Sequence, residues 1–137
     1  MSARDKYHNI VKKALIRDGW TITHDPYRIP IAMKRMEIDL GAEQTLAAER
    51  EARKIAVEVK SFTNPSIIHD FLRATGQYQG YMIVMRKKNI ERTMYLAMPF
   101  YIYERLAELQ FFTDILEELH IKLILFNPKS KSIESWK

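Results

Sequence analysis

The sequence predicts an α/β fold in which a mixed β-sheet is flanked by α-helices. Segments with alternating apolar residues lie close together in the first half of the chain, whereas helical segments separate the later ones. Neighbouring strands can form hairpins, and strands joined through a helix can pair in parallel, so we expect both kinds of pairing. The chain has 137 residues, of which 47% are hydrophobic and 28% charged, which fits a single domain over residues 1–137.

The first half of the chain begins with a helix and continues with strands. Apolar residues recur at helical spacing over Asp5–Arg17. Alternation predicts one strand over Trp20–His24, which a turn ends, and another over Lys34–Leu40. The segment Ala42–Arg53 is rich in Ala, Glu and Leu, so it predicts a short helix or helical turn. A strand over Lys54–Phe62 follows.

The second half alternates helices with strands. Asn64-Pro65-Ser66 opens the longest predicted helix, because proline is well tolerated at a first helical position. We expect its apolar face to consist of Ile68, Phe71, Leu72, Thr75 and Met82. The segments that follow are a strand over Thr93–Met98, helices over Phe100–Leu109 and Phe112–Leu119, and a strand over Ile121–Phe126. The polar tail Lys129–Lys137 is expected to fray.

Composition narrows the classes of function. The sequence has no cysteine, so disulfides and thiolate–zinc sites are excluded. Its start lacks the apolar run of a signal peptide, and no apolar run reaches ~20 residues, so we expect a cytoplasmic protein without a membrane segment. The net charge of +5 is compatible with binding DNA through its phosphates, although charge alone does not establish it.

The strand Lys54–Phe62 carries an unusual pair of charges. Side chains alternate between the two faces of a strand, so Glu58 and Lys60 share one face, opposite the apolar residues Ile55, Val57 and Val59. If the strand Lys34–Leu40 pairs with it, Asp39 lies beside Glu58. Two carboxylates that close repel each other unless a cation lies between them.

This arrangement predicts a metal site. A hard ion such as Mg²⁺, or Mn²⁺, takes carboxylate oxygens together with a backbone carbonyl, for which Val59 is available. Lys60 would then lie where it can orient an attacking water or take its proton. The other reading is an ordinary ion pair of Glu58 and Lys60 on a solvated sheet face.

Asp39, followed by Glu58-Val59-Lys60, resembles the site of the PD-(D/E)xK nuclease superfamily, which has the restriction-endonuclease-like fold. The resemblance implies that Asp39, Glu58, Lys60 and Gln77 form a catalytic site. Gln77 and Tyr81 form a Q-x-x-x-Y pattern that looks like the motif of RecB-type members, in which the helix carries a glutamine into the site. The residue before Asp39 is Ile38 rather than proline, a position that varies in that superfamily.

His8 lies on the first helix, where the same resemblance implies a third metal contact. The alternative, a solvated helix histidine, stays open. Basic residues could line a phosphate path or simply form solvated surfaces; these are Lys12, Lys13, Arg17, Arg86, Lys87 and Lys88.

Longer stretches are similar to the XisH family, the fdxN element excision controlling factors of cyanobacteria. They are DKYHNIVKKALIRDGWTITHDP, EIDLGAE, AAEREARKIAVEVKSF and GQYQGY. The resemblance implies a part in site-specific DNA rearrangement during heterocyst development, with XisI and a site-specific recombinase as partners. It leaves two readings: a metal-dependent endonuclease, or a non-catalytic controlling factor that binds DNA, XisI or the recombinase. The pair Phe111-Phe112 is a candidate contact for XisI or for a second copy of the chain.

Overall fold

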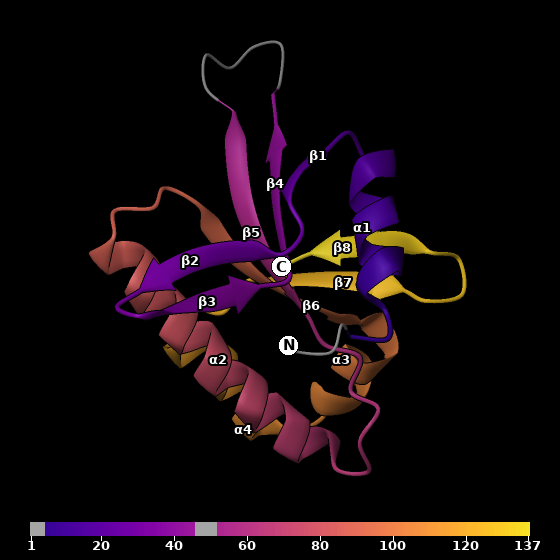
Figure 1. The fold of residues 1–137 in the computed structure, drawn as a ribbon. Helices are drawn as coiled ribbons and strands as arrows, with labels where there is room; N and C mark the ends of the chain where they lie inside the picture. The colour runs from indigo at the N-terminus through magenta and orange to yellow at the C-terminus, as the bar shows by residue number, and fades with distance from the viewer. Residues whose placement is uncertain (1–4, 46–51) are drawn as a thin grey trace.

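The computed structural model describes residues 5–45 and 52–137, and it has the expected α/β architecture. Its main sheet has six strands in the order β1-β4-β5-β6-β7-β8, and a separate hairpin is formed by β2 and β3 (Figure 1). The strands at both edges pair antiparallel, and the central strands β5, β6 and β7 pair in parallel. The predicted mixture of pairings is therefore confirmed.

The structure contains eight strands and four helices in its described residues. They are β1 (Thr21–His24), β2 (Tyr27–Ile31), β3 (Lys34–Ile38), β4 (Leu40–Gln44), β5 (Arg53–Val59), β6 (Thr93–Pro99), β7 (Leu123–Asn127) and β8 (Ser132–Trp136). The helices are α1 (His8–Arg17), α2 (Ile67–Lys87), α3 (Phe100–Leu106) and α4 (Gln110–Glu118). None of these helices combines the length and the apolarity that crossing a membrane requires, within the described residues.

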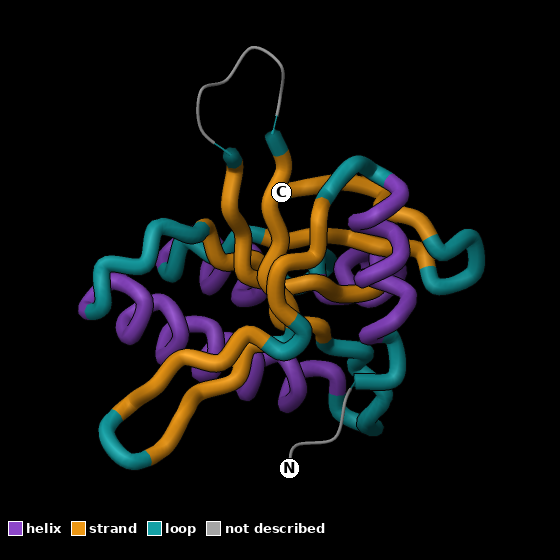
Figure 2. The backbone as a smooth tube through the Cα atoms, turned by 45° about the horizontal axis from the view of Figure 1, so that its top comes forward, coloured by secondary structure: helices purple, strands orange, loops and turns teal. Residues whose placement is uncertain are grey.

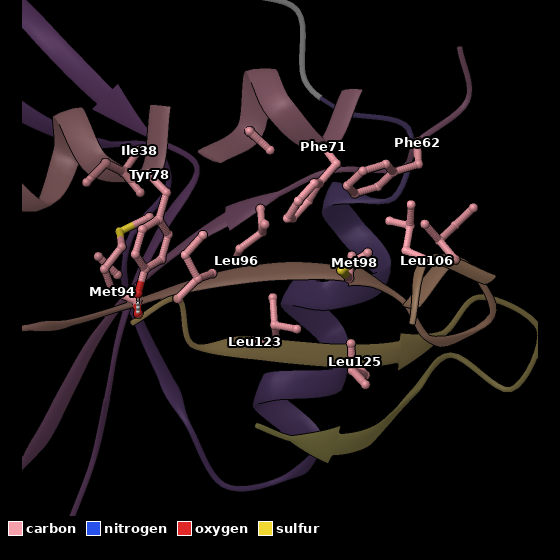
Figure 3. Close-up of a cluster of buried hydrophobic side chains, with 14 of the residues drawn as sticks. Ile38, Phe62, Phe71, Tyr78, Met94, Leu96, Met98, Leu106, Leu123 and Leu125 are labelled. Atoms are coloured by element: carbon pink, nitrogen blue, oxygen red, sulfur yellow. Dashed lines mark hydrogen bonds between the residues drawn. The ribbon is translucent and has the colours of Figure 1, made fainter. Parts of the chain in front are cut away.

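Each face of the sheet has its own apolar core. One core joins α2, α3 and α4 to the sheet and to the base of the β2–β3 hairpin. Figure 3 shows part of it, where Phe71 and Tyr78 of α2 lie over Leu96 and Met94 of β6. The other core joins α1 to the opposite face. β5 is buried on both faces over its second half. Glu58, near the end of this strand, is therefore a buried charged residue.

The predicted strand Lys34–Leu40 is divided in two. β3 ends at Ile38 and pairs with β2, which was not predicted, whereas β4 begins at Leu40 and pairs with β5. Asp39 is the single residue between them. The division positions the candidate site, because it places Asp39 where one strand leaves the hairpin and the next enters the main sheet.

Two other predictions about the elements are wrong. The helix or helical turn over Ala42–Arg53 is replaced by the second half of β4 and the start of β5, while residues 46–51 lie outside the described residues. The tail does not fray: β8 pairs with β7, and Trp136 stacks on Trp20 with ring centroids 5.6 Å apart.

The apolar face of α2 is rotated from the predicted one. Ile68, Leu72 and Met82 are exposed, and the buried residues are Phe71, Ala74, Thr75, Tyr78 and Met85. The side chain of Ser66 caps the helix by accepting the amide hydrogen of His69.

Candidate active site

Asp39 and Glu58 are held beside each other by backbone amides. β4 pairs with β5 so that Leu40 lies opposite Val57, which brings Asp39 next to Glu58. The Asp39 amide donates to Oε1 of Glu58 at 3.2 Å, and the Val59 amide donates to Oδ2 of Asp39 at 2.8 Å. The two carboxylates lie side by side, as predicted. Their hydrogen bonds to the backbone continue the pairing of β4 with β5 beyond the last paired residues.

The pair is buried, and this changes its acid–base behaviour. Glu58 is 7% exposed, and burial together with the charge of Asp39 raises the pKa of Glu58 to about 8. Lys60 acts in the opposite direction, with its Nζ 3.6 Å from Oε2 of Glu58. At neutral pH the pair therefore retains a proton where a cation could bind instead.

Helix α2 brings Tyr81 and Gln77 to the same region. The Tyr81 hydroxyl donates to Oε2 of Glu58 at 3.2 Å. Burial and the Glu58 charge raise the pKa of Tyr81, so the phenol stays protonated and remains a donor. The side chains around Glu58 therefore include Tyr81, which contacts the carboxylate directly.

Lys60 and Gln77 line a cavity of about 210 Å³ between the end of β5 and the first half of α2. Arg73 and Asp5 line it too. Both oxygens of Asp5 are occupied, because Oδ1 accepts from the Tyr7 amide and Oδ2 from the Ser61 amide. In the part of the chain that the structure describes, the side chains of Arg73 and Gln77 make no hydrogen bond, so both are available to a ligand in this cavity.

His8 is buried and contacts Asp25. It is 3% exposed, and its Nε2 lies 2.7 Å from Oδ1 of Asp25, whose Oδ2 accepts from Lys12. Burial raises the pKa of Asp25, but hydrogen bonds from Lys12 and His8 outweigh it and lower that pKa. The reading of His8 as a solvated helix residue is wrong, whereas its role as a metal contact stays a prediction.

The described residues contain no group of three or more His, Asp or Glu side chains arranged to hold a metal. What they offer is the pair Asp39 and Glu58, whose oxygens are the hard donors that Mg²⁺ or Mn²⁺ prefers. The carbonyl of Val59 as a further ligand stays a prediction, and so does any contribution of His8.

Sequence reasoning missed three residues that build this region. Asp5, before α1, accepts a hydrogen bond from the amide of Ser61, after β5. Asp25, between β1 and β2, forms a hydrogen bond with His8 of α1. The side chain of Arg92 is 8% exposed and donates to the carbonyls of Ala42 and Ile55, which joins β4 to β5. These contacts join residues far apart in the sequence, so no local sequence pattern predicts them. Only the closeness of Asp5 to His8 in the sequence offered a signal.

The fold and the site together define an α/β protein with a mixed sheet and a buried carboxylate pair at the β4–β5 junction. The XisH protein family matches residues 1–134, and the chain belongs to that family.

Two solved structures are similar over nearly the whole chain. The crystal structure of an XisH family protein from Nostoc punctiforme is 36% identical, with a TM-score of 0.83, and the match covers 96% of this chain and 98% of that one. The crystal structure of a fdxN element excision controlling factor protein from Anabaena variabilis is 36% identical, with a TM-score of 0.84, covering 97% of this chain and 98% of that one. No curated protein matches the chain.

Proposed function

We propose that the chain acts in DNA-element excision through a metal-dependent endonuclease site of the PD-(D/E)xK type. The observation that carries the proposal is the buried pair of Asp39 and Glu58, with Lys60 3.6 Å from Glu58. Burying two ionised carboxylates together is unfavourable without a cation. A domain that only binds DNA or a partner protein does not require such a pair. The relative from Anabaena variabilis, a fdxN element excision controlling factor, supplies the biological setting.

The residues present fit a divalent cation. Glu58 and Asp39 supply carboxylate oxygens, and burial beside Asp39 raises the pKa of Glu58, so added positive charge is favourable at this place. Asp39 and Glu58 would hold Mg²⁺ or Mn²⁺, with the Val59 carbonyl and His8 as candidate further ligands. The ion would neutralise negative charge on the phosphate that is cleaved.

The surrounding side chains have roles that suit phosphodiester hydrolysis. Lys60 would position the attacking water, and Gln77 would orient Lys60 or the substrate from the same cavity. Tyr81 would hold Glu58 in place through its hydrogen bond. Arg73, whose guanidinium lines the cavity without an internal partner in the described chain, would bind a neighbouring phosphate.

The direct test is cleavage of plasmid, linear and branched DNA with Mg²⁺ or Mn²⁺. The native chain should cleave at least one of these substrates, and Lys60→Ala and Glu58→Ala should abolish the reaction. Lys54→Ala is the matched control, because Lys54 is an exposed lysine on the same strand, before the buried part of β5. Cleavage that survives both substitutions, or that needs no metal, would contradict the proposal.

The second candidate is a non-catalytic controlling factor that binds DNA, an XisI-type protein or a site-specific recombinase. Two observations favour it: His8 is engaged by Asp25, and the relative's name refers to control. Its exposed contact would include Phe111, which is 37% exposed beside the fully buried Phe112. A pull-down of XisI that Phe111→Ser weakens and Lys60→Ala leaves unchanged, with no cleavage of any DNA, would favour this function.

A further inference from the structure

The hairpin of β2 and β3 projects from the body of the molecule, and its tip lies away from the main sheet (Figure 2). Its two strands pair over their whole length, from Tyr27 opposite Ile38 to Ile31 opposite Lys34. Ile29 and Ile38 are buried in the core that contains α2, so the base of the hairpin is anchored. The tip contributes nothing comparable to that core.

The outward face of the hairpin is basic. Arg28, Pro30 and Arg35 are exposed, on the face opposite to that of Ile29. Arg28 and Arg35 share one carboxylate, Glu37, with Nε to Oε1 distances of 3.3 Å and 3.9 Å, so a positive charge is left over. Lys34 pairs with Ile31 on the other face of the hairpin, is also exposed, and adds a charge at the tip. A surface of this kind is complementary to phosphates.

The tip of the hairpin carries an apolar side chain that packs against no other part of the described protein. Met33 is fully exposed, at 101%, in the turn between the two strands. An unpacked methionine followed by Lys34 and Arg35 matches the apolar wedges that some proteins insert between base steps in a groove of DNA. Pro30 lacks an amide hydrogen, which disfavours pairing of this edge with a strand of another protein.

The hairpin also leads directly to the candidate site. β3 ends at Ile38, and the next residue is Asp39 of the carboxylate pair. At about 3.3 Å per residue, Met33 at the tip lies roughly 20 Å along the strand from Asp39, or about six base pairs along a duplex. DNA that reaches the carboxylate pair from this side would therefore pass the basic face.

We propose that the β2–β3 hairpin is a DNA-binding arm for duplex flanking the site, with Arg28, Lys34 and Arg35 on phosphates and Met33 inserted between bases. This inference rests on the proposed action on DNA, but it does not require that the chain cleaves. It adds a substrate contact outside the carboxylate pair and its cavity.

The test measures the affinity of the full chain for fluorescent duplex DNA at several salt concentrations, with Ca²⁺ in place of Mg²⁺. Lys34→Gln with Arg35→Gln should weaken binding and reduce the slope of log affinity against log salt by about 2. The control is Lys129→Gln with Lys131→Gln, in the exposed β7–β8 turn away from the hairpin (Figure 1). Met33→Ala should reduce DNA bending, measured by energy transfer between the duplex ends, without changing the slope.

The outcomes separate this inference from the proposed function. Binding that depends on the hairpin, without cleavage by the native chain, supports the arm and contradicts the nuclease. Binding that both charge pairs affect equally, or that neither affects, overturns the arm, whatever the cleavage assay shows. Absence of any DNA binding by the native chain overturns both. Thermal unfolding confirms that the exposed substitutions leave the fold intact.

Discussion

The ionised forms of Asp39 and Glu58 repel each other inside the protein, and the residues around them relieve that repulsion only in part. The Val59 amide, Tyr81 and Lys60 all direct hydrogen or positive charge towards the pair. Burial and Asp39 still raise the pKa of Glu58 to about 8. Perturbed carboxylates in clefts are frequent at functional sites because catalysis and metal binding use them.

The pH dependence of stability follows from this pKa. The folded state keeps a proton on Glu58 up to about pH 8, whereas the ordinary value is 4.5. The stability gained from that proton is therefore present below about pH 4.5 and is lost as the pH rises through about 8. Without metal, the melting temperature of the native chain should fall over this range, and Mg²⁺ at high pH should restore it.

Glu58→Gln provides the comparison for this prediction. This substitution should remove the fall in melting temperature that Glu58 causes, and also the rise that Mg²⁺ produces at high pH. The exposed Glu104→Gln on α3 should retain both effects. Melting curves from pH 5 to pH 8 measure this directly. If native chain and Glu58→Gln show the same pH dependence, Glu58 does not carry the raised pKa.

Tyr81 is predicted to act as a positioning residue. Tyr81→Phe removes the hydrogen bond to Oε2 of Glu58, so the pKa of Glu58 should rise further and metal affinity should fall by about 10–100-fold. The pH profile of cleavage should move to higher pH. Tyr103→Phe is the control, since its hydroxyl makes no hydrogen bond within the described residues. An unchanged profile with Tyr81→Phe would remove Tyr81 from the site.

At the scale of the elements, two features position the site. Division of the predicted strand at Asp39 lets one segment form a hairpin while the next enters the main sheet. The long helix α2 packs Phe71 and Tyr78 inwards, so that Gln77 and Arg73 line the cavity beside Lys60. The residues that serve the site are therefore placed by the packing of apolar neighbours on the same helix.

The last strand supports the opposite side of the sheet. Trp136 stacks on Trp20 and makes an edge contact with Tyr95, with ring centroids 5.1 Å apart. Trp136→Ala should therefore lower the free energy of unfolding by about 1–3 kcal/mol, because a partly exposed aromatic residue loses its stacking partners. Urea unfolding measures this, and Lys129→Ala in the adjacent turn should change the stability little. An unchanged midpoint in Trp136→Ala would show that β8 adds no stability.

For the whole molecule, local patterns predicted the α/β class, most strands and the closeness of Asp39 to Glu58. They did so because alternation and strand pairing decide which residues share a face. They missed β2 and β8, which are short and stabilised by distant partners such as Trp20. They also missed the engagement of His8 by Asp25, since a contact across the fold leaves no periodic signal.

We propose that Asp39 and Glu58 bind a divalent cation. Crystals soaked in Mn²⁺ test it by anomalous diffraction. We expect an anomalous peak beside the two carboxylates and its loss in Glu58→Gln. The opposite result is Mn²⁺ bound elsewhere, or not at all, with Glu58 still accepting the Asp39 amide. It would leave the pair as a buried structural feature of a controlling factor.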